Sequence, residues 1–572
     1  MTAAPSAENT PHSFLDDILT GEIDWPRWLD FPRPDPAERN LGDQLVSETE
    51  KFFVERVDAE EVDDTRSLPS GLLDDLQERG YLRLVVPAEF GGRGLSPYTA
   101  FRVIAQACAH SVTAGQVIAI QNGVGAAAML PALPPGPLRD FVGARLAEGT
   151  VSGFADTDRS GQNNARPSLS AVPVEGGYLL RGEKLFTGNG SVADLIGVSA
   201  TVETADGPKV GAFFLDTHTP GFSVRTRVEF MGSRGLPNAS LALDDVFVPA
   251  EQALLDPDGD QLPPLVGLVA LLGRILFTGA PAMAIARNCL DWSRAFLARR
   301  AVDGRRLGEY DEIQRIVTAG LADVYAMETA ARWSLLTEDL GARWLERFLT
   351  KNLLVRGAWR MVDRTVSLHG GEGYETVASK KRRGAPPVPV ERAFRDARGL
   401  RVAGNVDFQL DNQLGRMVLD RFYTMAVSTA PASPAPATPA GRPPASGFPP
   451  LLREDADHLA ALVRQVRELA EGLVRDQPDP ARLYAGEHTV VLLGRALGEL
   501  FNAVAVLARA SAEDGTTPEQ PWQHAELAAV YVREARHRVE GLLARLRAQP
   551  RADHAAISRR WLAAPDDQLV RH

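Results

Sequence analysis

The feature that constrains the fold most is a change of hydrophobic periodicity along the chain. From about residue 40 to 148 apolar residues recur at helical spacing, and from about 149 to 255 they form short alternating runs separated by turn residues. Helical spacing returns from about 256 to 425, in helices that can bury their apolar faces only against one another. We therefore predict an α+β protein with an N-terminal helical domain, a small central β domain and a C-terminal helical bundle.

Three further segments flank this arrangement. Residues 1–39 form an N-terminal extension, and residues 426–447 are rich in Pro, Ala and Ser without an apolar period, which is typical of an extended linker. Residues 448–572 carry three amphipathic helical patterns. We expect them to form an extra helical module that is separable from the bundle. Because its charges are mixed, its apolar faces are expected to pack against each other or the main body rather than lipid.

Composition argues against several classes of protein. The chain of 572 residues is 44% hydrophobic and has a formal net charge of -12, so no overall basic field favours nucleic acid. We find no signal-peptide pattern and no uninterrupted apolar run of about 18 residues. The two cysteines, Cys108 and Cys289, are too few for a disulfide framework and are expected in the core. These features predict a cytoplasmic protein without a membrane span or a nucleic-acid partner.

Six motifs occur in a fixed order between about residues 40 and 420. They are PAEFGGRGLS, VEGGYLLRGEKLFTGNGSVAD, MGSRGLPNASLALDDVFVP, the RR…G…L…Q…LAD series from Arg299 to Asp323, SLHGGEGYE and VERAFRDAR. In this order the chain resembles the acyl-CoA dehydrogenase family of flavoproteins, and its last helices are placed like those of the very-long-chain branch. The resemblance implies FAD as cofactor and α,β-dehydrogenation of an acyl-CoA or acyl-carrier-protein thioester. It does not specify the acyl chain or the electron acceptor.

Two strings match the segments that hold the flavin ring in the family, TDRSGQN and KLFTGNG. If each carries a one-residue deletion, Thr157 and Thr187 supply the hydroxyl groups that bond the isoalloxazine. Without gaps, Asp156 and Gly188 occupy these positions. We favour the gapped alignment, although threonine at a strand end needs no functional reason.

An arginine from the partner subunit meets the FAD pyrophosphate in the family. Its spacing to the following glycine identifies it here as Arg300, with Arg299 adjacent. Asp303 stands where an aromatic residue is usual, and an acidic group near phosphate is unfavourable unless it points away or is paired. The alternative is a pair of solvated arginines at a helix end. An arginine that works across a subunit boundary implies a homodimer or homotetramer.

The glycine turn of SLHGGEGYE resembles the family segment that approaches the cofactor. Gly370 and Gly371 would let backbone amides come close to a ligand without a Cβ clash. Ser367 occupies the position of a family glutamine that contacts the adenosine side of FAD. A plain interhelical turn would need the same glycines, so the match gains weight only from its place ahead of VERAFRDAR.

The family's catalytic base is missing at both of its known places. Ala403 replaces the usual Glu after RDAR, and Gly273, just before Arg274, replaces the Glu of a minority of members. Asp407, one helical turn after Ala403, is the candidate relocated base; the alternative, which we favour, is a carboxylate that caps a helix. Ala403 retains the backbone N–H that bonds the thioester oxygen in the family. Arg274 and Gln162 are predicted to contact the substrate.

Three hypotheses therefore remain open from the sequence. The first is an acyl-thioester dehydrogenase with a relocated base, and the second is a flavin enzyme of other chemistry, such as a monooxygenase, on the same fold. The third is a non-catalytic subunit that binds flavin or an acyl group. Loss of a general base typically lowers a rate by about 10²–10⁴-fold, which would slow the first reaction without abolishing flavin binding.

Overall fold

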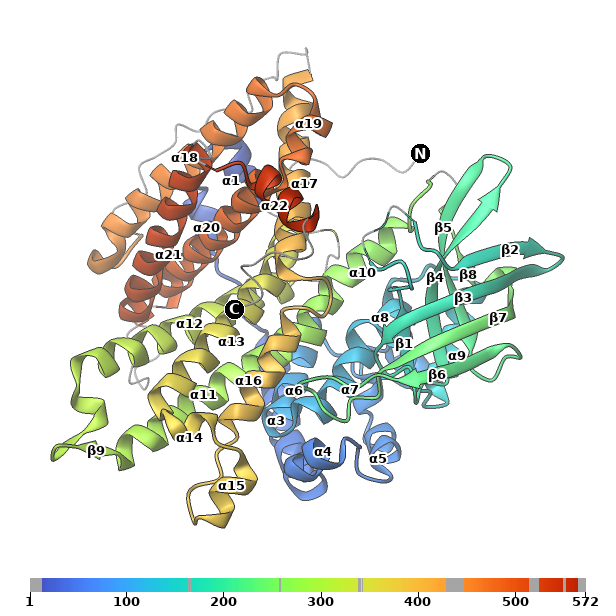
Figure 1. Ribbon diagram of the computed structural model, residues 1–572, viewed down its shortest axis with the longest axis horizontal. Helices are drawn as coiled ribbons and strands as arrows, with labels where there is room; N and C mark the ends of the chain where they lie inside the picture. The colour runs from blue at the N-terminus through green and yellow to red at the C-terminus, as the bar shows by residue number, and fades with distance from the viewer. Residues whose placement is uncertain are drawn as a thin grey trace.

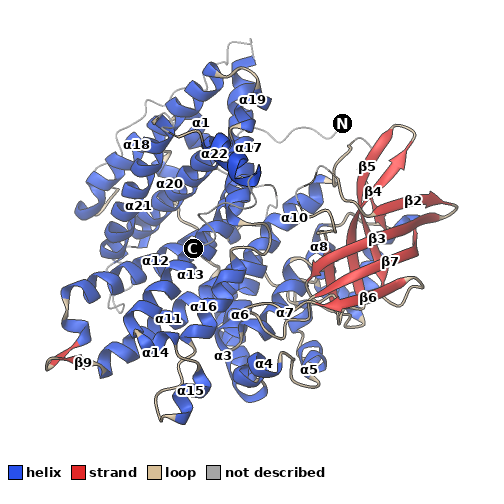
Figure 2. Ribbon diagram, viewed as in Figure 1, coloured by secondary structure: helices blue, strands red, loops and turns tan. Residues whose placement is uncertain are grey.

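The structure is a computed structural model that describes residues 13–162, 164, 166–256, 259–337, 341, 343–427, 447–513, 524–548 and 552–563. Most of the predicted linker, residues 428–446, lies outside these ranges. Along the described chain, helices come first, a single β domain follows, and further helices come after it, as the periodicity predicted (Figures 1 and 2).

Helices form the part of the chain before the β domain. They are α1 (Phe14–Thr20), α2 (Trp25–Leu29), α3 (Pro36–Arg56), α4 (Ala59–Thr65), α5 (Leu72–Glu78), α6 (Pro97–His110), α7 (Val112–Gly123), α8 (Ala126–Met129) and α9 (Pro137–Ala147). Local chemistry explains their starts: the Asp35 side chain accepts the N–H of Ala37 at the first turn of α3, and Pro36 occupies a position where no N–H is needed.

The β domain is an eight-stranded mixed sheet. Its strands are β1 (Ser152–Ala155), β2 (Ser170–Val174), β3 (Gly177–Thr187), β4 (Leu195–Thr204), β5 (Gly207–Asp216), β6 (Phe222–Arg227), β7 (Ala239–Pro249) and β8 (Ala253–Leu254). They follow the order β6-β7-β3-β2-β4-β5-β8, and β1 pairs in parallel with β4. This register brings the end of β1 beside the end of β3, where the two predicted flavin strings lie.

A bundle of long helices follows. Its elements are α10 (Pro264–Arg274), a π-helical turn (Ile275–Gly279), α11 (Ala280–Arg299), the small hairpin β9 (Ala301–Val302) and β10 (Arg305–Arg306), α12 (Asp311–Leu335), α13 (Trp344–His369), α14 (Gly371–Tyr374), α15 (Val377–Arg382), α16 (Val390–Leu400) and α17 (Asp407–Val427). The last described helices are α18 (Arg453–Asp476), α19 (Pro480–Ala485), α20 (Glu487–Glu513), α21 (His524–Arg547) and α22 (His554–Ala563).

The C-terminal helices share their hydrophobic core with the bundle, in line with the expectation that their apolar faces pack against each other or the main body. A single hydrophobic cluster joins α18, α20 and α21 to α12, α13 and α17 of the bundle. Close helix contact explains this: a Cβ on Gly415 of α17 would lie 2.4 Å from the carbonyl oxygen of Val490 in α20. Only glycine permits such an approach.

The N-terminal extension also belongs to this cluster. Trp28 is fully buried and stacks on Trp333 of α12 with ring centroids 4.1 Å apart. Phe14 lies 5.9 Å from the Phe501 ring of α20. In Figure 1 the blue helix α1 accordingly lies among the orange and red C-terminal helices. The two ends of the described chain thus stabilise one another.

Two helical stretches are long and apolar enough to cross a membrane, Pro264–Arg299 and Glu487–Glu513. Within the structure, 72% and 83% of their apolar windows are buried. This degree of burial is what core helices of a folded protein show, so length and composition carry no further weight here.

Candidate active site

Three predicted segments meet around Arg274, at the C-terminal end of α10. A Cβ on Gly404 would lie 3.3 Å from Cγ of Arg274, so the turn that follows α16 lies directly against this arginine. The pKa of Arg274 is lowered by burial, and the Asp156 carboxylate at the end of β1 opposes that effect. The guanidinium also lies over the Phe348 ring, 5.9 Å from its centroid. The end of β1, helix α10 and the 401–406 turn therefore converge.

The glycine that precedes Arg274 is required by packing. A Cβ on Gly273 would lie 1.7 Å from the carbonyl oxygen of Gly123 in α7, and a Cβ on Gly123 would lie 2.9 Å from the carbonyl oxygen of Gly273. The backbones of α7 and α10 therefore touch at these two residues. No carboxylate-bearing side chain fits at position 273 without separating the helices.

The backbone N–H of Ala403 is already engaged. It donates to the carbonyl oxygen of Gly399 at 3.0 Å and so extends the last turn of α16. The predicted role of this N–H as a free donor to a thioester oxygen does not match this arrangement. The N–H is engaged because helical hydrogen bonding continues beyond Leu400, the last residue of α16. The sequence does not reveal this continuation.

Asp407 is a buried, doubly ion-paired carboxylate. One carboxylate oxygen, Oδ2, lies 3.2 Å from Nε of Arg356 and 2.7 Å from a terminal nitrogen of Arg401. Burial alone would raise the pKa of Asp407, but these two guanidinium groups outweigh it and hold the pKa below its usual value. A carboxylate so stabilised is a weak base. The proposed role of Asp407 as relocated base is therefore disfavoured, and its place at the start of α17 fits the helix-capping alternative.

The two threonines of the flavin strings have different environments. Thr187 is 1% exposed at the end of β3, and its hydroxyl is buried with no protein hydrogen-bond partner. Thr157 is half-buried, and its hydroxyl bonds Oε1 of Gln162 at 3.3 Å. Gln162 also donates to Asp156 at 2.8 Å, which holds this exposed glutamine near the end of β1. A buried hydroxyl without a partner is unusual in a folded protein and is readily explained by a ligand.

The arginines after α11 and the glycine turn after α13 are brought together within one chain. Arg299 forms an ion pair with Glu372 of α14, whereas the Arg300 side chain is exposed. Gly370 adopts a positive φ of 57°, and no atom lies within 4 Å of a Cβ built on it. The same open space is found at Gly371. This turn therefore has room for a ligand on its outer side.

Two polar groups border the glycine turn. Ser367 is exposed, one helical turn before it. His369 is 5% exposed, its ring stacks on Phe296 at 4.2 Å, and its Nε2 is buried without a protein partner. Burial, reinforced by the charge of Lys380, lowers the pKa of His369 to about 4, so the ring is neutral at physiological pH. The sequence predictions missed His369, although its position directly before two glycines was a usable signal.

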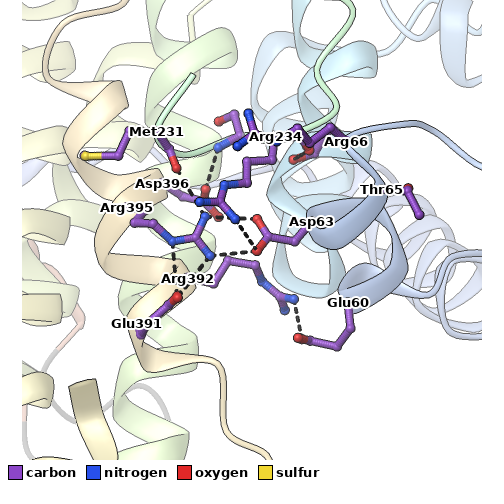
Figure 3. A network of polar contacts seen from close by, with 12 residues as sticks. Glu60, Asp63, Thr65, Arg66, Met231, Arg234, Glu391, Arg392, Arg395 and Asp396 are labelled. Atoms are coloured by element: carbon purple, nitrogen blue, oxygen red, sulfur yellow. Dashed lines mark hydrogen bonds and ion pairs between the residues drawn. The ribbon is translucent and has the colours of Figure 1, made fainter. Parts of the chain in front are cut away.

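A polar network anchors helix α16, which leads to the candidate site (Figure 3). Nitrogen atoms of Arg395 donate to Asp63 of α4 at 2.7 and 3.0 Å, and one also donates to the carbonyl oxygen of Met231 at 3.2 Å. Arg392 pairs with Glu60 of α4. Helices α4 and α16 are therefore joined through the RDAR motif and the segment between β6 and β7.

Asp396, the aspartate of RDAR, lies at the centre of the same network. Its carboxylate accepts the backbone N–H of Ser233 at 2.6 Å, and burial raises its pKa to about 6. A Cβ on Gly232 would lie 2.4 Å from the carbonyl oxygen of Arg395, so the β6–β7 segment rests on the backbone of α16. Asp396 and Arg395 of RDAR thus position helix α16 against the β6–β7 segment.

Models of three domains match the chain, and together they cover more than half of it. The acyl-CoA dehydrogenase N-terminal domain matches residues 42–132, the middle domain matches residues 153–246 and the C-terminal domain matches residues 272–412. The chain belongs to the acyl-CoA dehydrogenase family.

Relatives within the acyl-CoA dehydrogenase family support this assignment. A probable acyl-CoA dehydrogenase of Mycobacterium tuberculosis, FadE10, is 28% identical over 560 residues, which cover 93% of this chain and 85% of FadE10. A 3-sulfinopropanoyl-CoA desulfinase of Advenella mimigardefordensis is 25% identical and covers 67% of this chain and 94% of its own. A Bacillus anthracis acyl-CoA dehydrogenase, solved in complex with FAD, has a TM-score of 0.74 at 19% identity and covers 96% of this chain and 95% of its own. That likeness includes the C-terminal helices.

For this acyl-CoA dehydrogenase family member, FAD can be tested against the residues present. The buried, unpartnered hydroxyl of Thr187, the unpartnered Nε2 of His369 and the open glycine turn fit a polar ligand that is not part of the chain. Asp303 is exposed at the tip of the β9–β10 hairpin with a φ of 47°, so it need not face a phosphate. The residues present therefore fit FAD.

Sequence reasoning also missed Lys351 of α13. It is 1% exposed, and its ammonium group donates to the carbonyl oxygen of Asn405 at 2.8 Å, directly under the 401–406 turn. Burial lowers the pKa of Lys351 to about 7, and the Asp407 carboxylate opposes the shift. Its spacing of three and four residues from Phe348 and Val355 placed it on an apolar helix face, which is the signal that identifies it.

Proposed function

We propose that the protein is a FAD-dependent oxidoreductase that dehydrogenates an acyl thioester between its α and β carbons. The observation that carries the proposal is the convergence of the end of β1, Arg274 and the 401–406 turn at one place. These are the segments that the family resemblance assigns to flavin, substrate and base. Family membership and the FAD complex of the Bacillus anthracis protein support the same cofactor here.

FAD, when bound, supplies the hydride acceptor of this reaction. Thr187 would hold its ring system through the buried hydroxyl, and the turn at Gly370 and Gly371 would receive its adenosine side. Arg300 is exposed and so is available to a pyrophosphate in a second subunit. We therefore propose a homodimer or homotetramer as the working form. We also propose that the protein is located in the cytoplasm.

Arg274 is the residue best placed to act on the thioester. Its half-buried guanidinium would polarise a carbonyl oxygen and stabilise the negative charge that develops there when the α-proton leaves. The Asp156 carboxylate raises the pKa of Arg274 and so favours the charged form of the guanidinium. Among the described residues no carboxylate is assigned as base, because position 273 is closed by packing and Asp407 is ion-paired, so the α-proton would pass to solvent water.

A second candidate function is flavin chemistry that needs no strong base, on the same fold. It is favoured by the engaged state of Asp407 and by the alanine at position 403. The desulfinase of Advenella mimigardefordensis, a relative that is named for a reaction other than dehydrogenation, supports keeping this alternative.

Anaerobic titration of the purified, FAD-loaded protein with a series of acyl-CoA thioesters tests the proposal. Bleaching of the flavin absorbance by at least one thioester is expected. Retained yellow flavin that no thioester bleaches would favour the second candidate, and a protein that binds no flavin would remove both. Mass photometry should show a dimer or tetramer; a monomer with stoichiometric FAD would contradict the cross-subunit role of Arg300.

A matched pair of variants tests the cofactor site without an activity assay. Thr187→Val removes a buried hydroxyl that has no protein partner, so the protein should lose about five- to tenfold in FAD affinity, the value of one hydrogen bond. Thr157→Val, in the other flavin string, removes a hydroxyl that bonds Gln162 and should change the affinity little. Equal effects, or a larger effect of Thr157→Val, would reverse this assignment.

A further inference from the structure

The turn between α16 and α17, residues 401–406, has a backbone that must be held in place. Gly404 and Asn405 both have left-handed φ values, 64° and 76°, in succession. Asparagine tolerates this region better than most residues, yet the conformation is still less favourable than an extended or helical one. Two contacts close the turn: Lys351 donates to the carbonyl oxygen of Asn405, and the N–H of Asp407 donates to the carbonyl oxygen of Arg401 at 3.1 Å.

Side chains reinforce the same closure. The Arg401 guanidinium donates twice to Oδ2 of Asp407, at 2.7 and 2.9 Å, so the first residue of the turn is joined to the residue that follows it. Arg356 of α13 contacts the same oxygen at 3.2 Å and also forms a two-pronged contact with Asp411, at 2.5 and 3.2 Å. Asn352 donates both to the backbone oxygen of Asp407 and to Asp411.

In the part of the C-terminal region that the structure describes, Arg495 joins this network. Nε of Arg495, in α20, lies 2.9 Å from Oδ2 of Asp411. The contact is enforced by close helix packing, because a Cβ on Gly494 would lie 2.1 Å from the carbonyl oxygen of Asp411. A cavity of about 20 Å³, enough for one water molecule, lies beside these groups and is bordered by both Arg495 and Arg356.

The charges explain how a change at Arg495 reaches the turn. Asp411 is held by two guanidinium groups, those of Arg356 and Arg495, and Arg356 is in turn shared between Asp411 and Asp407. Within the described ranges, removal of Arg495 leaves Arg356 as the remaining guanidinium on Asp411. Arg356 is then drawn toward Asp411 and holds Asp407 less firmly, because attraction between partly buried charges falls with distance and is weakly screened.

We propose that Arg495 is a positioning residue through which the C-terminal helices fix the 401–406 turn against Arg274. The inference rests on the proposed function for its catalytic meaning, because the turn matters for the reaction only if it lies over the flavin. Its structural content does not need that assumption. The C-terminal helices therefore contribute to the geometry of the site as well as to the core.

Hydrogen–deuterium exchange on the full-length, FAD-loaded protein tests the proposal independently of activity. Arg495→Gln should raise exchange of the hydrogen-bonded amides of Ala403 and Asp407 by about tenfold, as expected for loss of a charge-assisted bond that holds the turn. Arg495→Lys keeps the charge and should restore most of the protection. Unchanged exchange across 401–407 in Arg495→Gln would overturn the proposal.

Arg533→Gln is the matched control. Arg533 pairs with Asp455 at 3.4 Å within the C-terminal helices, and the exposed fractions of the two side chains, 50% and 4%, resemble the 37% and 4% of Arg495 and Asp411. It should leave exchange at 401–407 unchanged. Equal exchange increases in both variants would show a general loosening of the C-terminal helices and would also overturn the positioning role.

A kinetic measurement separates this inference from the proposed function. With a thioester that bleaches the flavin, Arg495→Gln should lower the rate constant of flavin reduction at saturating thioester. This decrease should be about tenfold larger than any change in the thioester concentration that gives half of the maximal rate. If wild type never bleaches, the proposed function fails while the exchange result still decides the structural role of Arg495. If bleaching is normal in Arg495→Gln despite faster exchange, the turn is held by Arg495 but does not serve the reaction, and the catalytic part of the proposal is refuted.

Discussion

Asp407→Asn distinguishes a base from a structural ion pair. The substitution keeps the shape of a side chain that is 5% exposed but removes the charge that Arg356 and Arg401 share. Removal of one partner from a buried ion pair typically costs about 3–5 kcal/mol, and the retained amide oxygen places the expected loss near the lower figure, about 3 kcal/mol. The melting temperature should fall by about 5 °C or more. Flavin bleaching by a thioester should change little.

The pH dependence provides a second check on the same variant. The pKa of Asp407 in the folded protein lies below its ordinary value of 3.8. The stabilisation by the carboxylate is therefore complete above that ordinary value and is lost only as the pH falls through the lower folded pKa. The difference in melting temperature between wild type and Asp407→Asn should be constant from about pH 5.5 to 8.

The control is Glu312→Gln, because Glu312 and its partner Arg315 are both more than 60% exposed. Its melting temperature should match that of wild type, because water and salt screen an exposed ion pair. The reasoning is refuted if Asp407→Asn melts like wild type and loses bleaching by about 10² or more, since that is the behaviour of a general base.

Three further predictions concern neighbouring residues. Gly273→Ala should destabilise the protein by at least about 2 kcal/mol in thermal melts, because the new Cβ meets the carbonyl oxygen of Gly123; a neutral result would mean that α7 and α10 separate easily. Ala403→Glu should create or raise anaerobic flavin bleaching by acyl thioesters, because it returns a carboxylate to the turn beside Arg274, whereas an equally inert variant would argue against dehydrogenation. For Asp396, burial raises the folded pKa to about 6 from 3.8, so its stabilising contribution is present at low pH and is lost as the pH rises through about 6. Wild type should therefore lose stability relative to Asp396→Asn between about pH 4 and 6 and stay level above; a flat difference in melting temperature would contradict this.

Local patterns in the sequence predicted the elements of the fold well. The short strand-like runs predicted between about residues 149 and 255 include β2, β4 and β5, because strand-forming patterns depend on residues only two apart. The sequence shows that Gly273 replaces the glutamate of a minority of family members. The sequence does not show why glycine is required there, because Gly123, the residue that a Cβ would meet, lies 150 residues away.

The role of Asp407 shows where sequence reasoning reaches its limit. A carboxylate after a glycine turn is compatible with both a base and a cap, and the deciding partner, Arg356, lies on another helix 51 residues earlier. The packing of the C-terminal helices against the bundle shows the same limit. Amphipathic helices reveal that they have an apolar face, but the sequence does not show which face of which helix will cover it.

The burial of the first helices on the last ones has a consequence for synthesis of the chain. Trp28 packs 6.2 Å from Phe501, a residue that the ribosome adds about 470 residues later. At translation rates of about 5–20 residues per second, Phe501 is synthesised roughly 25–95 s after the aromatic residues that pack against it. During that interval Trp28 and Phe14 are apolar groups without a complete core, because Phe501 packs against both rings. Until Phe501 has been synthesised, burial of these two aromatic side chains therefore remains incomplete.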